Sequence, residues 1–148
     1  MAIPLLIALV ALVGVMISIQ GPINAHLGRS LGSPWAAALV SFAVGSLALS
    51  AMVLSRDDAR AALRHCGQAP WWAWIGGLLG ACYVTVIITA APRLGMAMII
   101  GVSVAGSVLA ALVLDHLGAF GLPVQPITPL RVLGALLVCA GVALARWA

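Results

Sequence analysis

The sequence predicts an all-α integral membrane protein with five transmembrane helices. The first observation is composition: 64% of the 148 residues are hydrophobic, only 7% are charged, and the mean hydropathy is +1.22. A soluble domain of this size carries about a quarter charged residues, so this chain could not cover its surface in water. The second observation is five apolar runs, each close to the roughly 20 residues that cross a bilayer. Together they exclude a soluble enzyme, a nucleic-acid-binding protein and a disordered tail.

The five apolar runs account for most of the chain. The predicted spans are residues 3–19 or longer, 34–54, 71–91, 96–114 and 129–147. The longest polar stretch between them is residues 55–69. We therefore expect a single transmembrane domain over residues 1–148 and no soluble domain.

Local residue chemistry supports the boundaries of these spans. Ser33 precedes Pro34 and Thr128 precedes Pro129. Each pair places a capping hydroxyl before a proline at the first helical position, where no amide hydrogen is missed. Pro92–Gly95 contains two residues that interrupt helices and separates the third span from the fourth.

The polar segment 55–69 is predicted to be a short amphipathic helix on the membrane surface. Arginines recur every fourth residue from Arg56 to Arg64, and Asp57 and Asp58 lie in the first turn, near the positive end of the helix dipole. This pattern is typical of a helix that lies on anionic lipid headgroups. A ligand-binding loop is the alternative interpretation.

The tryptophans test the span count independently, because this side chain favours the interface between membrane and water. All five fall at predicted span ends: Trp35, Trp71, Trp72, Trp74 and Trp147. Their positions therefore agree with five spans.

The seven arginines predict an unusual topology. The side that holds the N-terminus has four of them: Arg56, Arg60, Arg64 and Arg131. The opposite side has three: Arg29, Arg93 and Arg146. Orientation in the membrane follows an excess of arginine and lysine on the cytoplasmic side, and four against three is almost no excess. We expect insertion in both orientations; the alternative is one topology fixed by a strong local determinant such as the arginines of 55–69.

Polar residues inside a membrane are costly, so they are the first candidates for function. Gln20 and Asn24 lie four apart and so share a helix face. Pro22 between them frees the backbone carbonyl of Ser18 if the helix continues. These groups could bind a polar solute. In the alternative, Gln20 marks the point where the helix leaves the bilayer, since it lies roughly 25 Å beyond Ile3 at 1.5 Å per residue.

Three further polar residues are weaker substrate-binding candidates: Tyr83, Ser103 and Ser107. Such hydroxyls also bond neighbouring helices or their own backbone. Arg93 could point into a cavity shared with a second subunit, or extend to a lipid headgroup.

Asp115 is a candidate for proton coupling. The alternative is that its carboxylate is solvated at the interface or pairs with Arg131 near the start of the fifth span.

Small residues predict close helix packing and oligomerisation. Gly76 and Gly80 form a G-x-x-x-G pair, and Gly134 and Gly141 lie one heptad apart. The three cysteines form no framework, and His65-Cys66 is too small a set for a metal site. No nucleophile–base pair or phosphate-binding glycine loop is present, so we expect no catalytic residues, no metal, no cofactor and no enzyme activity.

Several sequence blocks together resemble the YdcZ-type family of small membrane proteins, a branch of the drug/metabolite transporter superfamily. The blocks are Gln20–Gly28, Gly32–Pro34, Pro70–Gly77, Ala91–Gly95 and Asp115–Gly118, followed by Arg131, Gly134 and Gly141. The family includes five-span proteins, paired proteins of opposite orientation and fused ten-span forms. The resemblance implies a protein of the bacterial inner membrane, a half-transporter that pairs with an inverted copy as an antiparallel homodimer.

The chain departs from a related group within that superfamily. Small multidrug resistance exporters use a glutamate in the first span to handle protons and cations, and this chain has no glutamate. A small neutral or anionic organic solute therefore fits better than a cationic drug. We expect a transporter that works by alternating access, with membrane lipid, a second copy and a small solute as partners and no nucleic acid. A dual-topology ion channel and a non-transporting membrane subunit are the alternatives.

Overall fold

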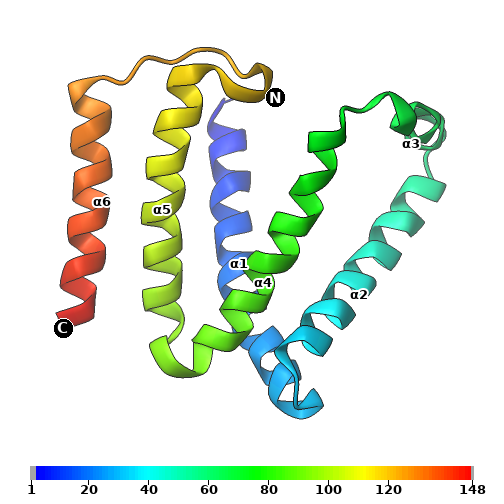
Figure 1. Ribbon diagram of the computed structural model, residues 1–148, viewed down its shortest axis with the longest axis horizontal. Helices are drawn as coiled ribbons and strands as arrows, with labels where there is room; N and C mark the ends of the chain where they lie inside the picture. Colours follow the sequence, from blue (N-terminus) through cyan, green and yellow to red (C-terminus); the bar gives the residue numbers. More distant parts are fainter. Residues whose placement is uncertain (1–2, 148) are drawn as a thin grey trace. The chain divides into compact units, whose positions relative to one another are not determined.

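The computed structural model describes the backbone of residues 3–147 and the side chains of residues 3–145. This part of the chain is helical, as predicted, and contains no strand (Figure 1). Its elements are α1 (Ile3–Leu31), α2 (Pro34–Leu54), α3 (Asp57–Ala62), η1 (Leu63–Gln68), η2 (Trp71–Trp74), α4 (Ile75–Leu94), α5 (Met96–Leu117), η3 (Ala119–Gly121) and α6 (Pro129–Trp147). The expectations for the side chains of Arg146 and Trp147 lie outside the described residues.

Four helical segments in the described chain are long and apolar enough to cross a membrane: Ile3–Leu31, Pro34–Leu54, Trp71–Leu94 and Met96–Leu117. A shorter apolar helix covers Pro129–Ala145. The helix α1 continues past residue 19, as the prediction allowed, whereas α4 and α5 end at Leu94 and Leu117 rather than at residues 91 and 114. In particular, α4 continues through Pro92, because a proline in the last turn removes only one backbone hydrogen bond.

The predicted helix starts are confirmed in detail. Ser33 is the N-cap of α2, and its Oγ accepts a hydrogen bond of 3.3 Å from the backbone N–H of Ala36. Thr128 plays the same part for α6, where its Oγ1 accepts from the N–H of Arg131 at 3.3 Å. The break between α4 and α5 falls at Gly95, whose φ of 73° is readily adopted only by glycine.

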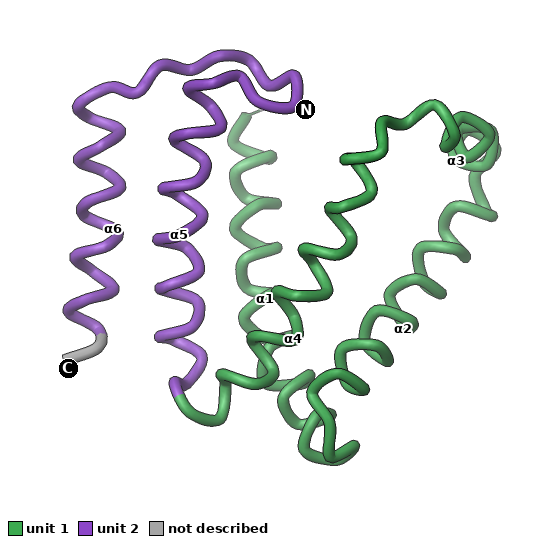
Figure 2. Tube along the Cα trace, viewed as in Figure 1, with its two compact units in different colours: residues 1–93 green, residues 94–148 purple. Residues whose placement is uncertain are grey.

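The chain divides into two compact units, residues 1–93 and residues 94–148 (Figure 2). In the first, α1 packs along α2. Gly28 of α1 allows a tight contact with α4, because a Cβ atom there would lie 2.8 Å from the Cγ2 of Ile88, whereas Ala37 of α2 is in ordinary contact, with its Cβ 3.8 Å away. Ala37, Ala38 and Ile88 form the buried core of this unit.

In the second unit, α5 packs against α6. A tight contact again occurs at a glycine: a Cβ atom at Gly101 would lie 3.1 Å from the Cγ2 of Val142. At Gly28 and at Gly101 the absence of a side chain therefore allows a close approach to another helix, as expected where small residues allow close packing in membranes.

The glycines that the sequence predicts to pack helices do not lie at these two tight contacts. A Cβ atom at Gly80 would lie 3.5 Å from the Cζ of Phe42, an ordinary van der Waals contact. At Gly76, Gly134 and Gly141, a Cβ atom would meet nothing within 4 Å among the described atoms. Packing of these three glycines against another helix remains a prediction about a second copy of the chain.

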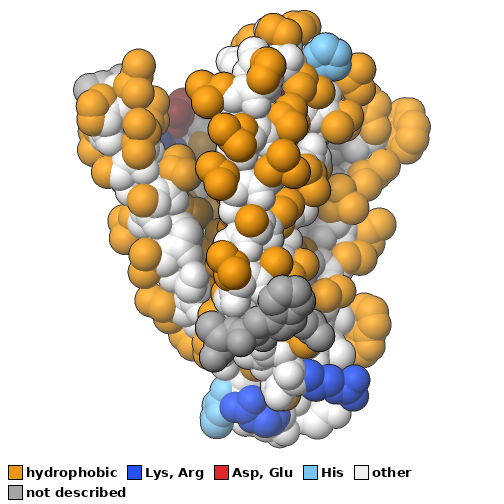
Figure 3. Space-filling view, turned by 90° about the vertical axis from the view of Figure 1, so that its left-hand side faces the viewer, with side chains coloured by type: hydrophobic (Ala, Val, Ile, Leu, Met, Phe, Trp, Pro, Cys, Tyr) orange, Lys and Arg blue, Asp and Glu red, His pale blue; other side chains and the backbone are white. Residues whose placement is uncertain are grey.

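Most large apolar side chains point outward. Leu39, Leu47 and Val86 are 72%, 72% and 64% exposed, and hydrophobic side chains are spread over much of the face seen in Figure 3, with arginine side chains gathered at its lower end. In water such a surface would drive aggregation, whereas lipid chains solvate it. Trp35, at the start of α2, is 74% exposed, which suits an interfacial anchor.

The segment 55–69 forms short helical turns with exposed ion pairs. Arg60 pairs with Asp57, and Arg56 lies 3.5 Å from Asp58. No residue of α3 or η1 is buried. The predicted contact of this segment with lipid headgroups stays a prediction.

The glycine contact at α1 predicts that Gly28→Val destabilises the protein. The added methyl groups would overlap Ile88, and overpacking of this kind costs about 1–3 kcal/mol. We expect the midpoint of thermal unfolding in detergent to fall by several degrees. Gly14→Val, in the same helix but with nothing within 4 Å, is the control and should change the midpoint little. Equal effects of the two substitutions would contradict the contact, and Ile88→Ala should partly restore Gly28→Val.

Candidate functional site

A pocket of about 220 Å³ lies within the first unit and contains Gln20 of α1. It is lined by Gln20, Ser41, Phe42, Gly45, Ser46, Leu49 and Val84. The side chains thus come from α1, α2 and α4. Gln20 also ends an open apolar groove along α1, formed with Val13, Met16 and Ile17.

The pocket lies at the middle of α2. This helix has 21 residues, Pro34–Leu54, and Ser41 and Ser46 are its eighth and thirteenth. At 1.5 Å per residue the helix is about 31 Å long, which matches the hydrocarbon core of a bilayer. The helix α1 does not end at Gln20 but continues to Leu31. Gln20 therefore lies level with the centre of a membrane-spanning helix, a position typical of substrate sites in transporters.

Asn24 has a different environment from Gln20. It is only 6% exposed and belongs, with Gly21, Ala25 and Gly28, to the buried face of α1. Its side-chain amide makes no hydrogen bond within the described part of the chain, where no side-chain nitrogen or oxygen is both fully enclosed and without a partner. The amide therefore keeps a small opening. The two residues predicted to act together are close, but only Gln20 lines the pocket.

Five hydroxyl groups in the long helices donate to a carbonyl one turn earlier on their own helix, at 2.7–3.2 Å: Ser18, Ser30, Thr85, Thr89 and Ser107. Ser41 and Ser46 make no hydrogen bond to any described residue, and neither does the Gln20 amide. The pocket therefore gathers three polar groups whose hydrogen-bonding capacity is not used by the fold.

The other substrate-binding candidates do not line this pocket. Tyr83 is 41% exposed on α4, beside Val84. Arg93 is exposed near the end of α4, nine residues beyond Val84, or about 13 Å at 1.5 Å per residue. Ser103 and Ser107 belong to the second unit, and Ser107 donates to the carbonyl of Ser103. Such a bond to the helix's own backbone is the predicted alternative to substrate binding.

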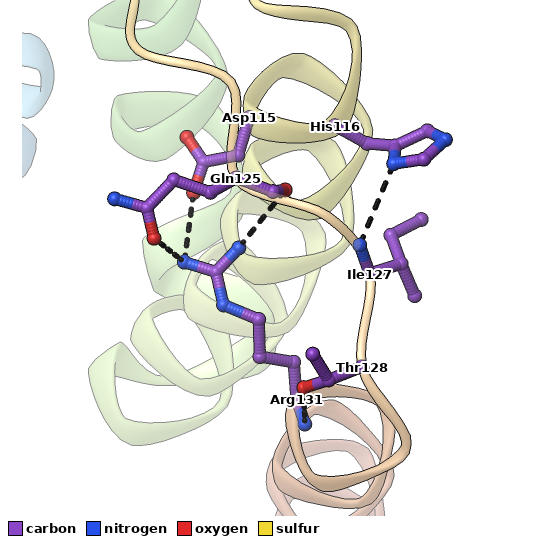
Figure 4. Close-up of polar contacts among 6 residues, drawn as sticks. All are labelled: Asp115, His116, Gln125, Ile127, Thr128 and Arg131. Carbon is purple, nitrogen blue, oxygen red and sulfur yellow. Dashed lines mark hydrogen bonds and ion pairs between the residues drawn. The ribbon is translucent and has the colours of Figure 1, made fainter.

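Asp115 pairs with Arg131 in the second unit (Figure 4). The Arg131 Nη2 donates to the Asp115 carboxylate at 3.2 Å and to the Gln125 side-chain oxygen at 2.9 Å. Its Nη1 donates to the Gln125 backbone carbonyl at 3.4 Å. Both members of the pair are about one-third exposed. This ion pair is the alternative to proton coupling that the sequence offered for Asp115.

The same cluster holds the connection between α5 and α6. The N–H of Gln125 donates to the Asp115 carbonyl at 2.8 Å, and the N–H of Ile127 donates to the His116 Nδ1 at 3.4 Å. Gly118 ends α5 in the left-handed conformation, with φ 59°. These contacts tie an irregular segment to the end of a helix. A groove of about 390 Å³ with mostly apolar walls begins at Asp115 and Arg131 and follows the two helices to Val138.

Sequence reasoning missed Ser41 and Ser46. The signal that could have found them is a set of small and polar residues in an apolar run: Ser41, Gly45 and Ser46. Their spacing, i, i+4 and i+5, places them near one helix face. The described residues contain no group of three or more His, Cys, Asp or Glu that could hold a metal ion.

Comparison with protein families agrees with this architecture. The model of the family described as "Putative inner membrane exporter, YdcZ" matches residues 5–144. The chain belongs to this family. No curated protein and no solved structure matches the chain. As a member of the YdcZ family with several apolar helices of membrane-spanning length, it is a multi-pass protein of the inner membrane. The description of the family names an exporter, and an exporter is not an enzyme class.

The ion pair at the end of α5 predicts that Asp115→Asn lowers stability. Arg131 would lose its charged partner, and the loss of a hydrogen bond to a charged group costs about 1–3 kcal/mol. We expect thermal unfolding in lipid nanodiscs to begin several degrees lower. Asp58→Asn removes an exposed pair, with side chains 66% and 76% accessible, and should leave the midpoint unchanged. A similar shift in both variants would show that the Asp115 contact adds nothing.

Proposed function

We propose that this YdcZ-family protein exports a small neutral or anionic organic solute by alternating access. The observation that carries the proposal is the Gln20 amide, without a hydrogen bond among the described residues, in a pocket level with the middle of α2. A polar group left unsatisfied in hydrocarbon costs free energy. A ligand that bonds to it recovers that cost, so such groups in membrane helices mark binding sites.

The transporter would consist of two copies of the chain in antiparallel orientation. Many carriers contain an inverted repeat with the substrate site at the repeat interface near the bilayer midplane, and here each copy would supply one repeat. The helix α6 has 19 residues, about 28 Å at 1.5 Å per residue, and would be the fifth span of each copy. The weak arginine bias and the open faces of Gly76, Gly134 and Gly141 support such a dimer.

The remaining candidate residues have subordinate roles in this proposal. Asn24 lies one turn beyond Gln20 on the packed face of α1, and Tyr83 or Arg93 of either copy completes the translocation path. Ser103 and Ser107 line the path only if α5 faces it. Asp115 is the chain's single carboxylate in a long apolar helix. As the coupling candidate, it would exchange its Arg131 partner for a proton.

The export proposal predicts that Gln20→Ala abolishes transport while the protein still assembles. Bacteria that express the wild-type protein should release at least one small organic solute in excess of empty-vector cells, measured by mass spectrometry of the medium. Gln20→Ala should reduce this excess at least tenfold at equal membrane abundance. Gln68→Ala, in the exposed segment between α2 and α4, is the matched control and should export normally.

Two results would contradict this assignment. Unchanged solute release by Gln20→Ala would remove Gln20 from the site. A steady ionic current from the purified protein in planar bilayers, without saturable solute flux, would favour a channel instead.

The antiparallel arrangement predicts partial labelling of Cys66. This cysteine lies in the exposed segment before α4, so it faces opposite sides of the membrane in the two orientations. In a Cys82→Ser/Cys139→Ser background, an impermeant maleimide should label only part of the Cys66 population in sealed cells, and the rest after permeabilisation. Cys66→Ser in that background is the blank. Complete labelling or complete protection in sealed cells would overturn dual insertion.

A further inference from the structure

We infer that the Gln20 pocket selects a small uncharged solute with a hydrogen-bonding edge and a flat apolar face, and that Ser41 and Ser46 determine this selectivity together with Gln20. The inference deepens the proposed export function and rests on it. It removes the anionic solutes that the proposed function still allows, and it adds two residues of α2 to the site.

We infer the hydrogen-bonding edge of the ligand from the polar side chains of the pocket that make no hydrogen bond within the fold. Five hydroxyls of the long helices already donate to their own backbone. Ser41 and Ser46 do not, and both line the pocket with the Gln20 amide. An amide offers both donors and an acceptor, and each hydroxyl offers one donor and two acceptor positions. The three groups together fit a ligand that both donates and accepts.

We infer that the ligand is uncharged from the residues that line the pocket. None of the seven lining residues is ionisable. Arg93 lies nine residues beyond Val84, and Arg29 lies nine residues beyond Gln20 on α1, so each is about 13 Å further along its helix. An ion in a low-dielectric site without a counter-charge is strongly disfavoured. Amide and hydroxyl groups alone therefore favour an uncharged ligand over a carboxylate or an ammonium.

The flat apolar face follows from Phe42. Its ring lies against Gly80 of α4, where an added Cβ atom would be 3.5 Å from the Cζ. Leu49 and Val84 extend this apolar wall. The volume, about 220 Å³, is below the roughly 300–1,000 Å³ of sites for drug-sized ligands. One copy of the pocket therefore suits a small metabolite more than a drug.

Three probes of nearly equal size and shape test the charge preference: benzamide, benzoate and benzamidinium. They differ mainly in charge, and benzamide presents an amide edge on a flat ring. We expect saturable binding of radiolabelled benzamide to the protein in nanodiscs, at least tenfold tighter than binding of either ion. Tighter binding of benzoate or benzamidinium, or no saturable binding of any probe, would overturn the inference.

Substitutions in α2 test the location. Ser41→Ala and Ser46→Ala should each weaken benzamide binding about three- to tenfold, the usual effect of one hydrogen bond. Gly45→Leu should abolish binding, because a Cβ atom there meets nothing within 4 Å and the new side chain would occupy the pocket. Ser50→Ala in the same helix and Gly14→Leu in α1 lie outside the pocket lining and should bind normally. Unchanged affinity in the Ser41, Ser46 and Gly45 variants would place the site elsewhere.

The two proposals can fail separately. If Gln20→Ala stops solute release while benzoate is the preferred probe, export stands and the uncharged-solute inference is wrong. If benzamide binds as expected but Gln20→Ala exports normally, the pocket binds a solute and the export assignment to Gln20 is wrong.

Discussion

The structure depends on one constraint: the hydrocarbon interior of a membrane offers no hydrogen bonds. Each backbone N–H and C=O must find its partner within its own helix, which explains why the described chain is helical and without strands. The helix starts obey the same rule. Ser33 and Thr128 supply oxygen acceptors to free amides, and a proline follows each of them where no amide is needed.

The same constraint sorts the polar side chains. Ser18, Thr85, Thr89 and Ser107 satisfy themselves on the preceding turn and cost little in lipid. The amide of Gln20 and the hydroxyls in its pocket are not satisfied in this way. Such groups at the centre of a membrane helix cost free energy unless something compensates them. The proposed solute supplies that compensation, which links the stability of the fold to its function.

The connection between α5 and α6 is held to the end of α5 without a regular helix. Its backbone groups bond to Asp115 and His116, and the Arg131 guanidinium joins the Asp115 carboxylate to Gln125. Asp115 therefore has a structural role whether or not it also exchanges protons. A coupling mechanism at this position would have to break the contact that orders the segment, so stability and coupling would oppose each other there.

The sequence by itself determined the membrane location, the helical class and the helix starts, because these follow from composition, run length and neighbouring residues. It also identified Gln20 as a polar residue in an apolar run. Only the tertiary structure decided which polar side chains meet. It buried Asn24, joined Gln20 to Ser41 and Ser46, and made Gly28 rather than Gly76 a contact glycine. The physical reason is that most faces of a membrane helix are apolar, so hydropathy gives no signal for how each helix is rotated toward its neighbours. That rotation follows from side-chain shape across helices, as at Gly28 and Ile88.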